Sequence, residues 1–149
     1  MKYLVVVAHP DDEVLGAGAT INKLVRNGNQ VEVCILCSRA EARSNRPTVH
    51  ELQEDLFASM HSLGVYHIYP GEFVDSQLNK FPHHDVVKFI EESIAASGAN
   101  CIITHHPNDL NNDHQITSKC CQEAARLSMR MTQNIPPVQA IYFMEVPSS

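Results

Sequence analysis

The sequence YLVVVAHPDDE at residues 3–13 joins an unbroken apolar run to a group of titratable side chains. The apolar part, residues 3–8, is rich in valine, as expected for a strand that is buried on both faces. The polar part, residues 9–13, then follows the carboxyl end of that strand. Open parallel sheets bind their ligands beyond the carboxyl ends of the strands. This one segment therefore predicts a fold class and the position of a site.

The rest of the chain repeats the alternation of apolar runs and helical patterns. We expect strands at residues 3–8, 31–37, 66–69, 101–104 and 140–146. Between them, apolar residues recur at helical spacing in four segments, and three of these end near Gly28, Gly64 and Gly98. Strands that alternate with helices in this way predict an α/β fold, a Rossmann-like, mainly parallel sheet with helices on both faces.

Size and charge narrow the function classes. The 149 residues are 44% hydrophobic and 19% charged, which predicts one domain over residues 1–149. A net charge of −6 argues against a protein that binds nucleic acid through its phosphates. No run of about 18 apolar residues is present, so we expect no transmembrane helix. The N-terminus lacks the pattern of a secretory signal, so we expect a cytoplasmic protein.

The five cysteines are expected to be packing residues. Their odd number and their spacing do not suggest a disulfide framework, in agreement with a reducing compartment. Cys34 and Cys37 have the C-x-x-C spacing of redox and zinc motifs. An offset of three within a strand predicts that they lie on opposite faces. No second pair has the spacing of a zinc ribbon.

The first polar cluster, HPDDE at residues 9–13, allows three interpretations. Its acids could lie in a solvated loop and complement the dipole of the next helix. That does not account for a histidine and two adjacent aspartates, whose mutual repulsion a bound dication would relieve. Gly16 and Gly18 suggest a dinucleotide-binding loop instead. The full G-x-G-x-x-G pattern is absent, however, and the acids would repel a pyrophosphate.

The second polar cluster, HHPNDLNNDH at residues 105–114, follows the fourth expected strand. It is rich in turn formers and could simply cap the following helix. Three histidines and two aspartates in ten residues exceed what capping requires. If the first and fourth strands are neighbours where the strand order reverses, both clusters face one cleft. One histidine and one aspartate from the first cluster and one histidine from the second then form the ligand set of a catalytic zinc site.

These two clusters resemble the motifs of the LmbE/PIG-L family of metal-dependent N-deacetylases. The matching elements read AHPDDE at residues 8–13 and HPNDLNNDH at residues 106–114. The resemblance continues through LGV at residues 63–65, a loop around Asp75, and a C-terminal segment that contains Tyr142 and the sequence EVP at 145–147. It implies a Rossmann-type fold and hydrolysis of acetamide groups, often on molecules containing N-acetylglucosamine, usually with zinc.

The resemblance also implies roles for individual residues. The metal ligands would be His9, Asp12 and His114. Asp11 would be the general base that takes a proton from the attacking water. Asp113 and Asp109 would hold the histidine tautomers and the loop geometry, although Asp113 could equally cap the helix. The metal would be Zn²⁺ or another divalent cation.

Two departures from the family pattern stand out. Asn111 occupies a position where many members have a histidine that acts as general acid or stabilises the oxyanion. A carboxamide donates a hydrogen bond but cannot deliver a proton, so Asn111 would stabilise the oxyanion or position the loop. Family chains also continue past residues 145–147, so we expect a truncated domain. Both departures keep open a catalytically inactive relative that binds a metal or a sugar.

Three further residues are candidates for contacts with a small N-acetylated, sugar-containing substrate. Arg43 lies in a basic stretch after the second expected strand, where it could clamp a phosphate or carboxylate or belong to a solvated loop. Asp75 matches a family loop that approaches sugar hydroxyls, or simply forms a turn. His106 could face the cleft or be a loop histidine bonded to backbone, and His105 carries a still weaker signal. The sequence leaves the oligomeric state open.

Overall fold

The structure is a computed structural model that describes residues 1–38, 49–130 and 137–147. Its strands are β1 (Lys2–Val7), β2 (Gln30–Ile35), β3 (Ile68–Pro70), β4 (Cys101–His105) and β5 (Ala140–Met144). Its helices are α1 (Asp12–Arg26), α2 (Val49–Ser62), α3 (His83–Ser97) and α4 (Asn112–Ser128), with a 3-10 turn, η1 (Leu78–Lys80). The strands pair in parallel in the order β3-β2-β1-β4-β5. The predicted α/β fold is confirmed.

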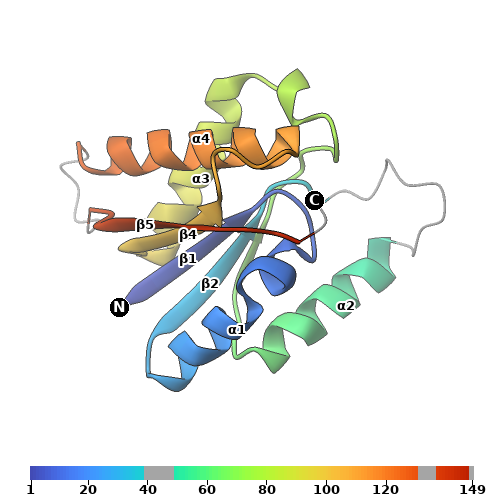
Figure 1. Ribbon diagram of the computed structural model, residues 1–149, viewed down its shortest axis with the longest axis vertical. Coiled ribbons are helices and arrows are strands. Elements are labelled where there is room, and N and C mark those ends of the chain that lie inside the picture. Colours follow the sequence, from blue (N-terminus) through green and yellow to red (C-terminus); the bar gives the residue numbers. More distant parts are fainter. Residues whose placement is uncertain (39–48, 131–136, 148–149) are drawn as a thin grey trace.

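Helices cover both faces of the sheet, with α3 and α4 on one side and α1 and α2 on the other (Figure 1). Strand β1 shows why, because its side chains alternate between two apolar layers. Leu4 and Val6 join the layer under α3 and α4, whereas Val5 and Val7 join the layer under α1 and α2. All four side chains are fully buried, as expected for the central strand of a doubly covered sheet.

The strand order reverses between β1 and β4, which lie side by side at the centre of the sheet. Val6 of β1 pairs with Thr104 of β4, so the two strands reach their carboxyl ends at the same level. The loops that follow them therefore meet at one edge, which is where open α/β sheets bind ligands. The prediction that the first and fourth strands are neighbours is confirmed.

Several local predictions need adjustment. Strand β3 begins at Ile68, two residues later than expected, and β5 ends at Met144. Gly64 and Gly98 adopt positive φ angles of 85° and 64° after their helices, as their helix-ending role predicts.

Among the described residues, no helix has the length and apolar character to cross a membrane.

The prediction that Cys34 and Cys37 lie on opposite faces was wrong. Strand β2 ends at Ile35, so the strict alternation of a strand does not continue to Cys37. Both side chains lie in the apolar layer under α3 and α4. All five cysteines are buried and none forms a disulfide, in agreement with their expected packing role.

Candidate metal centre at the carboxyl edge of the sheet

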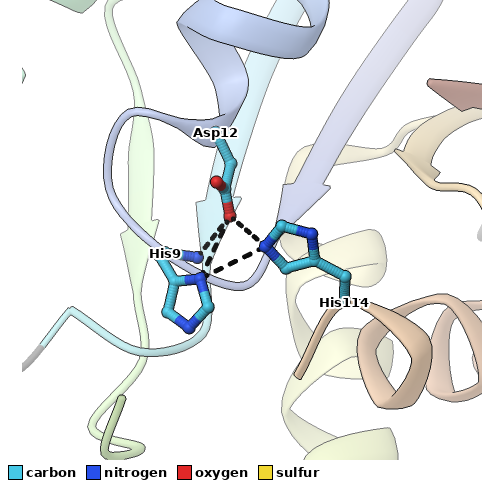
Figure 2. Close-up of side chains that lie close together, drawn as sticks. All are labelled: His9, Asp12 and His114. Carbon is cyan, nitrogen blue, oxygen red and sulfur yellow. Dashed lines mark hydrogen bonds and ion pairs between the residues drawn. The ribbon is translucent and has the colours of Figure 1, made fainter. Parts of the chain in front are cut away.

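Three buried side chains from the two polar loops converge beyond the ends of β1 and β4 (Figure 2). Asp12 Oδ2 lies 3.4 Å from Nδ1 of His9 and 3.2 Å from Nε2 of His114. The two ring nitrogens are 3.3 Å apart. The backbone N–H of His9 also donates to Asp12 Oδ2 at 2.9 Å, which fixes the carboxylate in the loop.

This triangle of atoms fits a tetrahedral metal ion. Ligand atoms at about 2.0–2.1 Å from a tetrahedral zinc ion lie about 3.3–3.4 Å from one another. The three separations of 3.2 to 3.4 Å match that spacing without any rearrangement. Two imidazoles and one carboxylate are also a common donor set for catalytic zinc. The residues present therefore fit a divalent cation.

The charges of the site are strongly coupled. Burial alone would lower the pKa of His9, but hydrogen bonds to Asp113 and Asp12 more than offset it and raise this pKa to about 9. Burial alone would raise the pKa of Asp12, and the hydrogen bonds from His114 and His9 instead hold it well below its usual range. In the absence of a metal ion, positive imidazolium therefore neutralises the buried carboxylate.

Asp113, the second residue of α4, forms a hydrogen bond with the ring nitrogen of His9 that faces away from Asp12 and His114. Its Oδ2 accepts a hydrogen bond from His9 Nε2 at 2.8 Å, which keeps a proton on Nε2. Nδ1, which faces Asp12 and His114, is then the nitrogen whose proton a metal ion would displace. The same carboxylate accepts the backbone N–H groups of Ser76 at 2.7 Å and Leu78 at 3.2 Å. Asp113 does not cap α4, because Asn111 occupies the cap position.

Asp109 lies beside the outer nitrogen of His114. Its Oδ2 is 3.2 Å from His114 Nδ1, an ion-pair distance without hydrogen-bond geometry, whereas His114 Nε2 faces Asp12 and His9. Asp109 Oδ1 accepts the backbone N–H of Asn111 at 2.9 Å and so shapes the start of α4. Each histidine of the triangle therefore has a carboxylate beside its outer nitrogen.

Asp11 combines exposure with an unusual backbone. It is exposed and precedes α1 with φ at 90°, in the left-handed region that non-glycine residues rarely adopt. Its backbone carbonyl accepts the N–H groups of Val14 and Leu15, whereas its side chain makes no capping hydrogen bond. Strained backbone of this kind clusters at functional sites, and here it leaves a carboxylate exposed next to Asp12.

Asn111 is the N-cap of α4. Its Oδ1 accepts the backbone N–H groups of Asp113 at 2.9 Å and His114 at 3.4 Å. The carbonyl half of the side chain therefore orients the turn that carries both residues. A role in stabilising an oxyanion through the amide N–H stays a prediction.

The predicted substrate residues differ in their distance from the triangle. Asp75 Oδ1 lies 3.2 Å from His9 Nε2, so this side chain borders the site. His106 is exposed, packs edge-on against Phe143, and accepts the backbone N–H of Asn108. It lines an open cleft of about 350 Å³ together with Asp109 and residues 145–147. Arg43 lies outside the described residues. Contacts of these residues with a substrate stay predictions.

His105 and Cys37 are two neighbours of the site to which the sequence assigned no role in it. His105 is fully buried and stacks on His114 with ring centroids 3.8 Å apart and an 11° interplanar angle. Its Nε2 accepts the backbone N–H of Ala8 at 3.0 Å. Burial and the charge of His114 lower its pKa to about 4, so it is neutral. The sequence feature that could have indicated this contact is the position of His105 as the last residue of β4, at the edge where the site lies.

A model of the PIG-L family, described as GlcNAc-PI de-N-acetylase, matches residues 4–125. The chain belongs to the PIG-L family. The match spans both polar loops and includes His9, Asp12 and His114. The comparison with curated proteins gives no match.

Solved structures share the fold of this PIG-L chain. The conserved protein TT1542 from Thermus thermophilus is 22% identical with a TM-score of 0.82 over 95% of this chain. The N,N'-diacetylchitobiose deacetylase from Pyrococcus horikoshii is 22% identical with a TM-score of 0.81 over 98% of it. The 4-carboxy-2-hydroxymuconate hydratase GalB from Pseudomonas putida is also 22% identical, with a TM-score of 0.70 over 95%.

The chain spans 64%, 61% and 62% of the lengths of these three proteins, respectively. Two of them carry names of different reactions, deacetylation and hydration. The shared fold therefore does not by itself define the reaction, and the side chains at the site must carry that argument.

Proposed function

We propose that this protein is a metal-dependent N-deacetylase that hydrolyses the acetamide of a small, N-acetylglucosamine-like substrate to acetate and a primary amine. The observation that carries the proposal is the triangle of His9, Asp12 and His114, with each histidine backed by a carboxylate. Membership of the PIG-L family and the likeness to a chitobiose deacetylase support the same reaction.

The donor set supports a resident divalent cation, which we propose to be Zn²⁺. His9 would bind it through Nδ1, His114 through Nε2 and Asp12 through Oδ2, the three atoms that already lie 3.2 to 3.4 Å apart. When bound, such an ion supplies Lewis-acid chemistry, which polarises a carbonyl group and makes water more acidic. Asp113 would hold His9 in the tautomer that this binding needs through its hydrogen bond, and the charge of Asp109 would favour a proton on Nδ1 of His114.

Asp11 is the proposed general base. Its carboxylate follows the strained turn after β1, is exposed, and makes no capping hydrogen bond. It would take the proton of the attacking water as the water oxygen adds to the acetamide carbon. It would then return that proton to the nitrogen as the carbon–nitrogen bond breaks, which releases a neutral amine.

Asn111 cannot serve as the acid in this reaction, because a carboxamide has no labile proton near neutral pH. Its Oδ1 is occupied with capping α4. We propose that it acts by holding the turn that carries Asp113 and His114, and that any contribution to the oxyanion comes from its amide N–H. Proton return therefore rests on Asp11.

The test is release of acetate by the zinc-loaded protein from a panel of N-acetylated sugars and thiol conjugates. We expect turnover that Asp11→Asn lowers about 10²–10⁴-fold while the bound metal is retained. Matched samples of His84→Ala, which alters an exposed histidine in the first turn of α3, control for nonspecific effects. Metal binding without acetate release from any member of the panel would favour the inactive relative, for which Asn111 at a usual histidine position is the supporting feature.

The proposed location is the cytoplasm. All five cysteines are buried and unpaired, which supports a reducing compartment.

A further inference from the structure

We propose that His9, Cys37 and Asp113 form a second site, specific for a thiophilic divalent cation, on the opposite side of the His9 ring from the first. One ring nitrogen of His9, the sulfur of Cys37 and one oxygen of Asp113 all lie within 4.8 Å of one another, and all three residues are buried. Figure 2 shows that the second ring nitrogen of His9 points away from Asp12 and His114.

The backbone brings these side chains together from three separate elements. Cys37 follows β2, and its N–H donates to the carbonyl of Ala8 at 2.8 Å, which places it beside the residue that precedes His9. Asp113 arrives from the first turn of α4. The cluster is therefore set by tertiary structure and does not depend on a single flexible loop.

The outer nitrogen of His9, Nε2, is the ring nitrogen that faces Asp113 and Asp75. His9 Nε2 lies 2.8 Å from Asp113 Oδ2 and 3.2 Å from Asp75 Oδ1. Two carboxylates therefore face the Nε2 side of the ring, where a cation would be stabilised.

The chemistry of the donor set indicates which cation would bind. A thiolate and an imidazole are soft to borderline ligands that favour Zn²⁺, Co²⁺ or Cd²⁺ over Mg²⁺ or Ca²⁺. The ion takes the place of the Nε2 proton of His9, whose ring, with Nδ1 already on the first ion, then becomes an imidazolate of charge −1. Coordination also removes the thiol proton of Cys37. Both protons pass to solvent, and no oxidation or reduction occurs.

Occupation of this site would alter the first one. Asp113 orients His9 through the Nε2 proton alone, and that proton is lost when the ion binds. The same carboxylate must turn from the backbone N–H groups of the 76–78 turn toward the ion. The second site is therefore expected to be weaker than the first and to fill only at excess metal.

The test is titration of the metal-free chain with Co²⁺, followed in the near ultraviolet, where cobalt bound to a thiolate gives a sulfur-to-metal charge-transfer band. We expect wild type to show this band after the first equivalent of cobalt. Cys37→Ser and Cys37→Ala should lose the band and still bind one equivalent. Cys120→Ser, which alters another buried cysteine, should keep it, and Mg²⁺ should not compete.

His114→Ala separates this inference from the proposed function, because it removes a corner of the first triangle and leaves all members of the second cluster. That variant should keep the charge-transfer band even if the first site or the deacetylase activity proves wrong. If the Cys37 variants do not fold by circular dichroism, Asp75→Asn provides the test and should weaken cobalt binding at the second site by about 10-fold. Absence of the band from wild type at saturating cobalt, its persistence without Cys37, or unchanged affinity in Asp75→Asn would overturn the proposal.

Discussion

Asp113 accepts the Nε2 proton of His9 across 2.8 Å, although the two residues are 104 positions apart in the sequence. This hydrogen bond selects the tautomer of His9 and thereby aims Nδ1 at Asp12 and His114. The same carboxylate holds the backbone of Ser76, a non-glycine residue with φ at 61°. One buried side chain thus joins the first polar loop, the turn before η1 and the start of α4.

Removing one oxygen of that carboxylate is expected to weaken both metal binding and the fold. In Asp113→Asn, the amide group cannot accept all three hydrogen bonds that the carboxylate accepts. Loss of a carboxylate behind a histidine ligand typically lowers metal affinity about 10–100-fold. Competition with a chromogenic chelator measures that affinity. Asp85→Asn, on the exposed first turn of α3, is the matched control, and equal affinities in both variants would contradict the role of Asp113.

The proposed metal ligands can be tested by measuring the metal content of purified variants. His9→Ala and His114→Ala should each leave an incomplete triangle and reduce the zinc content of protein purified with one equivalent of metal. His106→Ala, which changes an exposed histidine of the same loop, should retain zinc. Elemental analysis of the three variants decides the matter, because full occupancy in both triangle variants would mean that the metal binds elsewhere.

The two adjacent aspartates of the first loop should behave differently. Asp11→Asn should keep the metal, because its side chain is outside the triangle, and should keep the turn, because asparagine tolerates positive φ. Turnover should fall about 10²–10⁴-fold, the usual contribution of a general base. Asp12→Asn should instead lose metal. If metal leaves Asp11→Asn as readily as Asp12→Asn, the roles of the two residues have been exchanged.

Asn111 offers a choice between two roles that one pair of variants separates. Asn111→Ala removes the cap of α4 and should lower the free energy of unfolding by about 1 kcal/mol. Asn111→Asp caps equally well and should preserve stability. If Asn111 acts only through the cap, Asn111→Asp should also retain activity. If its amide donates to the oxyanion, Asn111→Asp should lower turnover more than Asn111→Ala, so urea unfolding and acetate release must be measured on both variants.

A pH effect away from the site is expected from Tyr69. Burial and the hydrogen bond between its hydroxyl and Glu32 at 2.6 Å raise the pKa of this phenol above its ordinary value of 10.0. A raised pKa in the folded state stabilises the protein fully below about pH 10, and this contribution is lost as the pH rises above that value. The difference in ultraviolet titration between wild type and Tyr69→Phe should show that the Tyr69 phenolate forms at a pH above the ordinary value of 10.0. Glu32→Gln should bring that midpoint down, and an unchanged midpoint would show that burial alone is responsible.

Much of the fold followed from local patterns. The run of valines at residues 3–8 could satisfy both of its faces only inside a sheet covered on two sides, and glycines with positive φ ended α2 and α3 as expected. The limits of the elements were less predictable. The apolar run that contains Cys37 continues past β2, where Leu36 and Cys37 still donate to the backbone of Val7 and Ala8 and are buried in the layer under α3 and α4.

The sequence by itself determined which residue types the site contains, because two clusters rich in histidine and aspartate directly follow apolar strands, the ends at which parallel sheets bind ligands. Only the tertiary structure decided which of those residues contact one another. The pairing of Asp113 with His9 and the approach of Cys37 to both of them join segments that are far apart in the chain. Such contacts depend on strand order and on the register between β1 and β4. Both arise from the packing of the whole sheet, so no residue spacing within a single segment predicts them.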